Sequence, residues 1–455
     1  MSMRCRCCCC FSIAILLWLC LSAPAPAASV VDPNLKVQTW VRGLQNPTGM
    51  AFVDGGSRAL VLEKDTGRVR IVTGRSVTGT ALDLPVANNS ERGLLGIALS
   101  PTFSTDNFVY LSYTRSTADG GAAFDNRVER FRWNGSTLTF DRRILTMPAS
   151  PGPNHDGGKI AFGPDGKLYA TIGDLNRDNS NANFERAKQI DRTGAILRIN
   201  PSGTAVTSNP FYDARFIGTP NEAINDVFAY GIRNSYGIAF DPRSGFLWDT
   251  ENGPDRMDEI NRVSRGFNSG WQSIMGPVSR NGGTTGKLVS FGPAAHYEDP
   301  HLSFSTPVAP TEAYFLETSR LGQKYTHDLF VGTVLGDGVI YQFDMSPSRK
   351  TLGLFDGPLA DGVADNSNGN LLAEQSQIIF GRDFGVVTDM VAGAGGMYVL
   401  SLSNDVMYRI TTDTASGSGG GGGGGIIPTP EPPPLVLLAA GMTFVLRRGT
   451  RKGHC

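Results

Sequence analysis

Cysteine is missing from almost the whole chain. All seven cysteines stand near the two ends of the 455 residues, at Cys5, Cys7, Cys8, Cys9, Cys10, Cys20 and Cys455. The body therefore has no disulfide framework, no thiolate metal site and no cysteine nucleophile. An excess of one charge is also missing, because 41 basic residues balance 42 acidic ones. That balance gives no electrostatic reason to expect nucleic acid or an anionic membrane as a partner.

Several well-known nucleotide and hydrolase motifs are absent too. The sequence has no Gly-x-Gly-x-x-Gly after a strand, no Walker loop, no Gly-x-Ser-x-Gly and no His-Glu-x-x-His. Nicotinamide, nucleotide, serine-hydrolase and zinc-protease functions therefore lack support. Glycine, in contrast, is abundant at 56 residues, and 40% of the chain is hydrophobic. This composition is typical of a turn-rich β protein with a hydrophobic core.

The N-terminal residues 1–28 predict a signal peptide. Arg4 and Arg6 precede an apolar stretch at 11–21, and Ala-Pro-Ala at 25–27 is a small-residue cleavage region. Lipidation at Cys20 is disfavoured because Leu19 stands where a small residue is expected.

The C-terminal residues predict a sorting tail. Residues 413–429 form a Gly- and Ser-rich linker. Residues 430–455 join Pro-Glu-Pro, about a dozen apolar residues and a basic end, and resemble the PEP-CTERM signal of Gram-negative bacteria. The resemblance implies transient membrane anchoring and removal by an exosortase-type enzyme, with a plain anchor as the alternative. We expect the globular part to be exported, to the periplasm, the cell surface or the medium.

Between the two ends, residues 34–412 repeat one pattern, in which a small apolar group is followed by a Gly-containing turn and a strand rich in aromatic and β-branched residues. Six units begin at Pro47, Arg92, Gly157, Tyr236, His327 and Thr388. Their period-two alternation, without sustained helical periodicity, predicts an all-β, six-bladed β-propeller, with two stacked β domains as the alternative. Residues 195–199 predict a strand that closes the third blade, and residues 276–304 predict a long loop over one face.

His155 is the best candidate for a general base among five histidines. It stands in a loop that leads directly into a strand, and an imidazole titrates near neutral pH. A structural role is the alternative on local evidence. Asp174, after the next strand, could orient the imidazole or simply end the strand, and the pattern favours the turn. The Asp-rich stretch 176–181 lacks the ligand spacing of a calcium loop and predicts a solvated loop.

A dense group of polar residues lies at 230–271. Arg233 could stabilise negative charge on a substrate or cofactor, and Asn234 could supply an amide hydrogen bond. The turn at Gly253 and Pro254 exposes main-chain carbonyls of the kind that calcium favours. Asp258 and Glu259 could brace that turn, or serve as capping or surface residues.

Taken in order, five motifs resemble the soluble glucose and sorbosone dehydrogenase family. They are NHDGGKIAFGPDGKLYATIGD from 154, GAILRINPSG from 194, NPF from 209, YGIRNSYGIAFDP from 230 and ENGPDRMDEIN from 251. The likeness is strong over 46–271 and weaker to 410. The resemblance implies a six-bladed propeller that oxidises a sugar, an aldose or sugar alcohol, by hydride transfer to pyrroloquinoline quinone and then to an external electron acceptor.

The resemblance also implies a role for particular residues. His155 matches the general base, Arg233 the arginine that stabilises the reduced cofactor, and Asn234 a cofactor contact. Tyr236 falls at a cofactor-binding position where the best-known members carry Gln. The main-chain carbonyls of Gly253 and Pro254 match the ligands of the calcium that polarises the quinone.

Two stretches depart from the family pattern. Where the best-known members carry a Lys in the fifth blade and two Arg in the sixth, this chain has LGDGVI from 335 and GVVTDM from 385. Each lost charge-assisted contact to a quinone carboxylate is worth about 1.5 to 3 kcal/mol, so weaker cofactor binding is expected. Two alternative functions are a non-catalytic extracellular propeller that binds sugar or protein, and a calcium-dependent lactonase.

Overall fold

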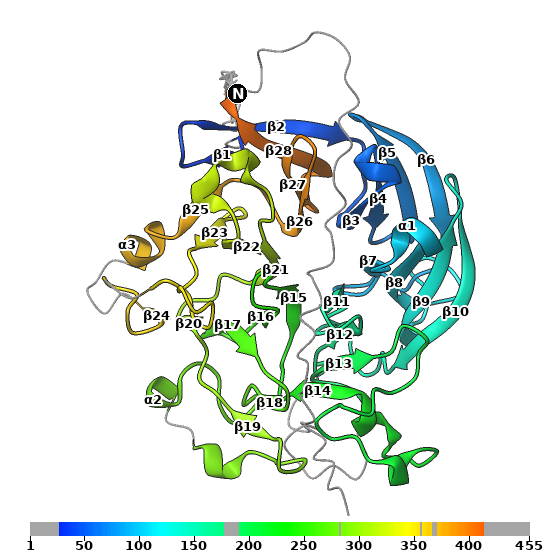
Figure 1. Cartoon of the computed structure of the whole chain (residues 1–455), viewed down its shortest axis with the longest axis vertical. Helices are drawn as coiled ribbons and strands as arrows, with labels where there is room; N and C mark the ends of the chain where they lie inside the picture. Colours follow the sequence, from blue (N-terminus) through cyan, green and yellow to red (C-terminus); the bar gives the residue numbers. More distant parts are fainter. Residues whose placement is uncertain (1–26, 177–190, 282–283, 355–356, 366–370, 414–455) are drawn as a thin grey trace, which may run out of the picture.

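The computed structural model describes residues 27–176, 191–281, 284–354, 357–365 and 371–413. Their strands form six sheets around a common axis, and the architecture is an all-β propeller (Figure 1). Each sheet contains one of the six sequence repeats. The predicted all-β propeller is therefore confirmed, and the alternative of two stacked β domains is wrong.

The first three sheets follow the chain closely. The first consists of β3 (Pro47–Val53), β4 (Arg58–Glu63), β5 (Arg68–Thr73) and β6 (Ser76–Asp83). The second consists of β7 (Leu94–Leu99), β8 (Phe108–Arg115), β9 (Asp125–Trp133) and β10 (Leu138–Met147). The third consists of β11 (Ile160–Phe162), β12 (Leu168–Ile172), β13 (Ala195–Ile199), β14 (Val227–Tyr230), β18 (Phe267–Asn268) and β19 (His296–Tyr297).

The other three sheets recruit strands from distant parts of the chain. The fourth consists of β15 (Ser235–Phe240), β16 (Leu247–Glu251), β17 (Asp258–Val263), β20 (Leu302–Phe304) and β24 (Val363–Ala364). The fifth consists of β21 (Pro310–Phe315), β22 (Leu329–Thr333), β23 (Ile340–Phe343), β25 (Ile379–Arg382) and β1 (Ser29–Val30). The sixth consists of β26 (Val387–Gly393), β27 (Gly396–Ser401), β28 (Val406–Thr412) and β2 (Leu35–Arg42).

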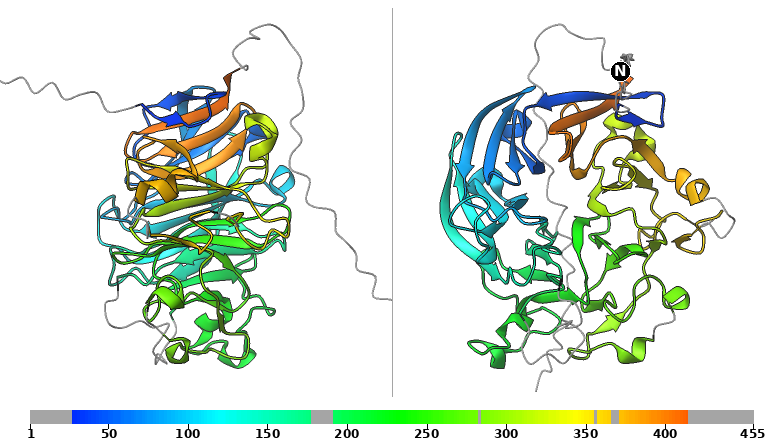
Figure 2. Two further views of the ribbon diagram at one scale, coloured as in Figure 1. Left: turned by 90° about the vertical axis from the view of Figure 1, so that its left-hand side faces the viewer. Right: turned by 180° about the vertical axis from the view of Figure 1, so that it is seen from behind.

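The innermost strands form a closed ring. They contact one another in the order β3, β7, β11, β15, β21 and β26, and β26 in turn contacts β3. The view from behind shows the same circular order (Figure 2). Both ends of the folded part complete the ring, because β2 pairs antiparallel with β28 and β1 pairs with β25. Loops at the ends of all the inner strands can therefore meet near the axis.

The helices are short and lie between strands. The α-helices in the described part are α1 (Phe103–Asp106), α2 (Val278–Asn281) and α3 (Leu371–Ser376). The 3-10 helices there are η1 (Asp54–Gly56), η2 (Ala214–Phe216), η3 (Glu222–Asp226), η4 (Thr285–Lys287), η5 (Ser319–Leu321) and η6 (Gln323–Tyr325). None of these described helices has the length and apolar character of a membrane span.

Two local predictions need correction. Residues 276–304 are not one long loop, because α2, η4, β19 and β20 lie in this range. The predicted strand at 195–199 is confirmed as β13, but β14 pairs on its outer side, so β13 does not close its sheet. The predicted signal peptide, the sorting tail and most of the stretch 176–181 lie outside the described residues.

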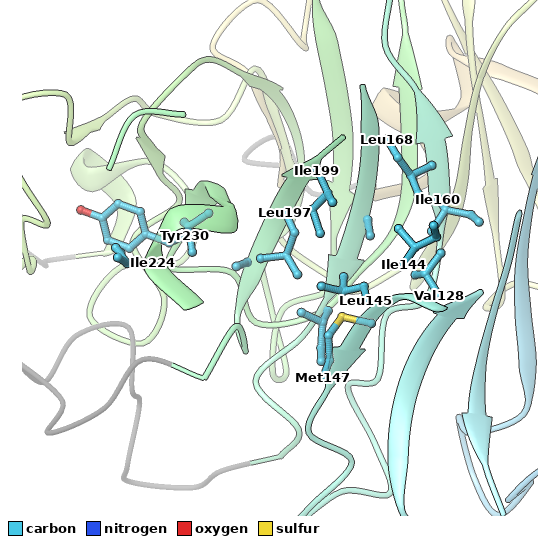
Figure 3. Packing of buried hydrophobic residues seen from close by; sticks show 14 of the residues in the cluster. Val128, Ile144, Leu145, Met147, Ile160, Leu168, Leu197, Ile199, Ile224 and Tyr230 are labelled. Atoms are coloured by element: carbon cyan, nitrogen blue, oxygen red, sulfur yellow. The ribbon is translucent and has the colours of Figure 1, made fainter. Parts of the chain in front are cut away.

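Hydrophobic packing between neighbouring sheets holds the ring together. One cluster joins Val128, Ile144 and Met147 of the second sheet to Leu168 and Leu197 of the third (Figure 3). All five residues of β12 are buried because this strand is covered on both faces. Burial of each large aliphatic side chain contributes about 1.5 to 3 kcal/mol, so these contacts fix the positions of the loops that follow the strands.

Candidate active site

A cavity of about 570 Å³ is lined by residues on or next to all six sheets. Five of the six predicted site residues line it, namely His155, Arg233, Asn234, Tyr236 and Gly253. Pro254 is exposed and is not among the lining residues. The fold therefore brings together groups that stand up to about one hundred residues apart in the sequence.

His155 is held by a carboxylate. Its Nδ1 lies 2.6 Å from Oδ1 of Asp174, and only 7% of His155 is exposed. Because an ionised carboxylate can only accept, Nδ1 carries the proton and Nε2 is left as an acceptor. The favoured interpretation of Asp174 as a mere strand end is wrong, because its side chain orients the imidazole.

Asp174 is itself fixed on both sides. Its Oδ2 accepts a hydrogen bond of 2.8 Å from the indole Nε1 of Trp271, and its main-chain nitrogen donates to the carbonyl of Arg233 at 2.9 Å. The described contacts thus form a chain from Trp271 through Asp174 to His155. Such a chain fixes both the tautomer and the direction of the imidazole.

Glycines allow the loops to approach each other. A Cβ on Gly173 would lie 2.4 Å from the carbonyl oxygen of His155 and 2.6 Å from that of Arg233. A Cβ on Gly158 would lie 2.7 Å from the side chain of Leu95 in the second sheet. His155 itself has a φ of 63°, an uncommon conformation for a residue with a side chain. The surroundings therefore hold His155 in one unusual backbone position.

Arg233 lies beside the same group. Its Nη1 donates to the carbonyl of Asn252 at 2.9 Å, and its guanidinium carbon lies 5.5 Å from the centre of the Trp271 ring. Its main-chain nitrogen donates to Oε1 of Glu251 at 2.6 Å. Trp271 therefore contacts both Arg233 and the carboxylate that orients His155.

Asn234 and Tyr236 present buried polar atoms to the cavity without partners. Oδ1 of Asn234 and the hydroxyl of Tyr236 have no hydrogen-bond partner among the described residues. Burial, together with the nearby charge of Glu91, raises the pKa of Tyr236 well above its usual value. Buried polar atoms without partners are costly, so both are well suited to contact a bound ligand.

Glu91 is a site residue that the sequence analysis missed. Its Oε2 accepts a hydrogen bond from the main-chain nitrogen of His155 and another from Nδ2 of Asn234, at 3.2 Å. It stands 64 and 143 residues from these partners. No local pattern marks such a residue, because only the packing of consecutive sheets brings its partners near.

The side chain of Asp258 holds the turn at Gly253 in place. The main-chain nitrogen of Gly253 donates to Oδ1 of Asp258 at 2.7 Å, and Oδ2 of Asp258 accepts from the nitrogens of Val308 and Ala309, both at 2.7 Å. Asp258 therefore braces the turn, and the alternative of a surface role is wrong. Within the described chain, no group of three His, Cys, Asp or Glu side chains could hold a metal ion. The calcium site at the carbonyls of Gly253 and Pro254 stays a prediction.

The charge around the cavity is uneven. Its cationic lining residues are Lys64, Lys159 and Arg233, which lie next to strands of the first, third and fourth sheets. The wall next to the fifth and sixth sheets contains Val334, Val386 and Leu402 instead. The stretches from 335 and 385 that lack the family's Lys and Arg therefore lie at or next to the cavity, and the described lining residues of this wall include no cation.

Three buried acids form a group next to Arg233, whose main-chain nitrogen donates to one of them, Glu251. Asp249, Glu251 and Glu259 are at most 1% exposed. Burial, followed by the negative charge of a neighbouring acid, raises the pKa of Asp249 and of Glu251 to about 8 and that of Glu259 well above its usual value. The hydroxyl of Ser269 lies 2.5 Å from Oε2 of Glu251 and 3.3 Å from Oε2 of Glu259, so it bridges the two acids. These acids are therefore protonated or share protons at neutral pH.

Comparison with known proteins shows the family of the chain. The family model described as Glucose / Sorbosone dehydrogenase matches residues 44–353. The chain is 25% identical to quinoprotein glucose dehydrogenase B of Acinetobacter calcoaceticus over 359 residues, which covers 64% of this chain and 73% of that protein.

Solved structures show the same fold. A crystal structure of a putative oxidoreductase (glucose dehydrogenase) from Thermus thermophilus is 27% identical, with a TM-score of 0.63, over 83% of this chain and 99% of that one. The PQQ-bound aldose sugar dehydrogenase of Streptomyces coelicolor is 24% identical, with a TM-score of 0.60, over 85% and 99% of the two chains.

Proposed function

The chain belongs to the glucose/sorbosone dehydrogenase family, and from that premise we propose that it oxidises an aldose or a related sugar alcohol with pyrroloquinoline quinone and calcium. The observation that carries this proposal is the buried pair of His155 and Asp174, which opens onto the same cavity as Arg233. Counting each of the six sheets as one blade, we also propose a six-bladed propeller.

The residues of the cavity fit the quinone. Oδ1 of Asn234 and the hydroxyl of Tyr236 are buried polar atoms that can contact it, and Lys64 and Arg233 supply positive charge for carboxylates. Arg233, Asn234 and Tyr236 would hold the quinone, and the carbonyls of Gly253 and Pro254 would hold calcium. The quinone, polarised by calcium, supplies the hydride acceptor when bound.

His155 has the geometry of a general base. With Nδ1 donating to Asp174, the free Nε2 takes the proton of the sugar hydroxyl that is being oxidised. Asp174 then stabilises the imidazolium, and Trp271 keeps Asp174 in place. Arg233, positioned by Asn252 and Trp271, stabilises the negative charge that develops in the cavity.

Reconstitution tests the proposal directly. The purified protein is loaded with pyrroloquinoline quinone and calcium, and dye reduction is measured over a panel of aldoses and sugar alcohols. We expect turnover that falls by about 10² to 10⁴ in His155→Ala, since this is the usual contribution of a general base. His301→Ala is the matched control, because that histidine is not among the lining residues. Absence of both quinone binding and turnover in the unaltered protein would refute the proposal.

A second candidate function follows from the apolar wall. Val334, Val386 and Leu402 offer no charge to a tricarboxylate cofactor. A non-catalytic propeller that binds a sugar in this cavity would need none. Binding of a sugar in calorimetry without any quinone binding would favour this function over the dehydrogenase.

The proposed location is outside the cytoplasm of a Gram-negative bacterium. The predicted signal peptide and sorting tail support export, and the reduced cofactor would then pass its electrons to an external acceptor. Mass spectrometry of the mature protein isolated from its host identifies its first and last residues. A mature protein that retains residues 1–28 would contradict export by a cleaved signal.

A further inference from the structure

The three cations that line the cavity differ in their hydrogen-bond and ion-pair partners. We propose that Lys64 binds a carboxylate of the quinone and so replaces the cations that the fifth and sixth sheets lack. This inference depends on the proposed function, because it concerns the same cofactor. In the bound complex, a carboxylate of the quinone would lie next to the first sheet.

The side chain of Lys64 is held in place by two hydrogen bonds and keeps one N–H donor of Nζ without a partner among the described residues. The residue directly follows β4 and lines the cavity, with 12% of its side chain exposed. Its Nζ donates to Oδ1 of Asp65 at 2.7 Å and to the carbonyl of Asn88 at 3.1 Å. An ammonium group has three N–H donors, so one remains for a ligand.

Gly93 makes room for this side chain. A Cβ at Gly93 would lie 2.5 Å from Cγ of Lys64 and 2.5 Å from its carbonyl oxygen, and the φ of Gly93 is 149°. The carbonyl of Lys64 also accepts a hydrogen bond of 3.0 Å from the nitrogen of Leu94. The first and second sheets thus approach each other closely at Lys64, and this contact restricts the position of its side chain.

The other two cations have other partners. Nζ of Lys159 pairs with two carboxylates, those of Glu312 and Asp389, the latter at 2.9 Å. Two acidic side chains of the chain itself thus face Nζ of Lys159, whereas one faces Nζ of Lys64. Arg233 donates to the carbonyl of Asn252 and lies beside the ring of Trp271, and the proposed function already assigns it to the charge that develops in the cavity. Lys64, with one carboxylate partner, is the lysine better able to accept an anionic ligand.

The test measures quinone binding rather than turnover. The full chain with calcium is titrated with pyrroloquinoline quinone by calorimetry at two salt concentrations. Loss of one charge-assisted contact is expected to raise the Kd of Lys64→Met at least about tenfold and to reduce its salt dependence. Lys64→Arg should retain part of the affinity. Lys350→Met is the matched control, since Lys350 is exposed and is not among the lining residues.

An esterified cofactor tests the chemistry of the contact. The trimethyl ester of the quinone has no carboxylate charge, so the unaltered protein and Lys64→Met should bind it equally. Gly93→Ala provides an independent variant that should weaken binding of the free acid by displacing Lys64. If Lys64→Met does not fold, as judged by its melting temperature, Lys64→Gln takes its place.

The outcomes separate the two proposals. If the unaltered protein does not bind the quinone, the proposed function fails, and this inference fails with it. If the unaltered protein binds the quinone and the variants of Lys64 and Gly93 bind it equally well, only this inference is overturned.

Discussion

Asp249 is expected to destabilise the folded protein at neutral pH, and Asp249→Asn should remove that cost. Asp249 lies in β16, is 0% exposed, and neither of its carboxylate oxygens has a partner among the described residues. Burial, and then the charge of Glu259, raises its pKa to about 8. The unfolded chain has the ordinary value of about 3.9. The folded protein therefore holds this proton more tightly than the unfolded chain does.

The sign of the pH dependence follows from that difference. Below about pH 4 the acid is neutral in both states, so it costs nothing. As the pH rises from about 4 to about 8, the unfolded chain releases the proton and the folded protein keeps it, so stability falls by about 1.4 kcal/mol per pH unit. At pH 7 the cost reaches about 4 kcal/mol for a group that titrates alone. Glu251 and Glu259 share this environment and therefore reduce the part assigned to Asp249.

Asparagine has the shape of a protonated aspartic acid and no charge to bury. Asp249→Asn should therefore match the unaltered protein near pH 4 and be up to about 4 kcal/mol more stable at pH 7. In a chain of this size each kcal/mol shifts the melting temperature by about 1 to 2 °C, so a rise of about 4 to 8 °C is expected at pH 7.

Melting temperatures from pH 4.5 to pH 8 provide the assay. Asp83→Asn is the matched control, because the side chain of Asp83 is 59% exposed and its ion pair with Arg68 is worth little. Its melting temperature should differ little from that of the unaltered protein at any pH. An equal shift for Asp249→Asn at pH 4.5 and at pH 8 would refute the reasoning, since only a pH-dependent gain reports a buried charge.

Three further predictions concern the site. Asp174→Asn should lower kcat by about 10²-fold or more with little change in KM, because the imidazole loses its orienting anion, and steady-state kinetics across pH measures this. Trp271→Phe keeps the ring for Arg233 but removes the donor to Asp174, so kcat should fall by about tenfold only, and an unchanged rate would contradict the contact. Chelation of calcium should lower the melting temperature and weaken quinone binding, with recovery on adding calcium but not magnesium.

The strands were the most predictable part of the molecule. Period-two alternation and Gly turns located the inner hairpin of every sheet, including β11 and β12 around the turn at 164–166. The strands β18, β19 and β24 could not be found this way, because each has two residues and pairs in parallel with a distant partner. A two-residue strand carries no periodic signal, so its position depends on the sheet it joins.

The site was predictable only where a motif is local. His155 and Arg233 stand in recognisable loops, and their meeting in one cavity follows from the predicted propeller. The roles of Asp174, Glu91 and Trp271 depend on hydrogen bonds across 19, 64 and 97 residues. Such pairs are set by how neighbouring sheets pack, which no single stretch of sequence encodes.

The closure of the ring by β2 and β28 sets an order of events during synthesis. Lys36 and Asp413, at the ends of this pair, are joined by an ion pair of 3.0 Å across 377 residues. At about 5 to 20 residues per second, a ribosome needs roughly 20 to 75 s to make the second strand after the first. Until then β2 has no partner, and an unpaired strand edge invites association with other chains. Contacts this distant also fold slowly. The sixth sheet can therefore be completed only after the C-terminal strand β28 has been made.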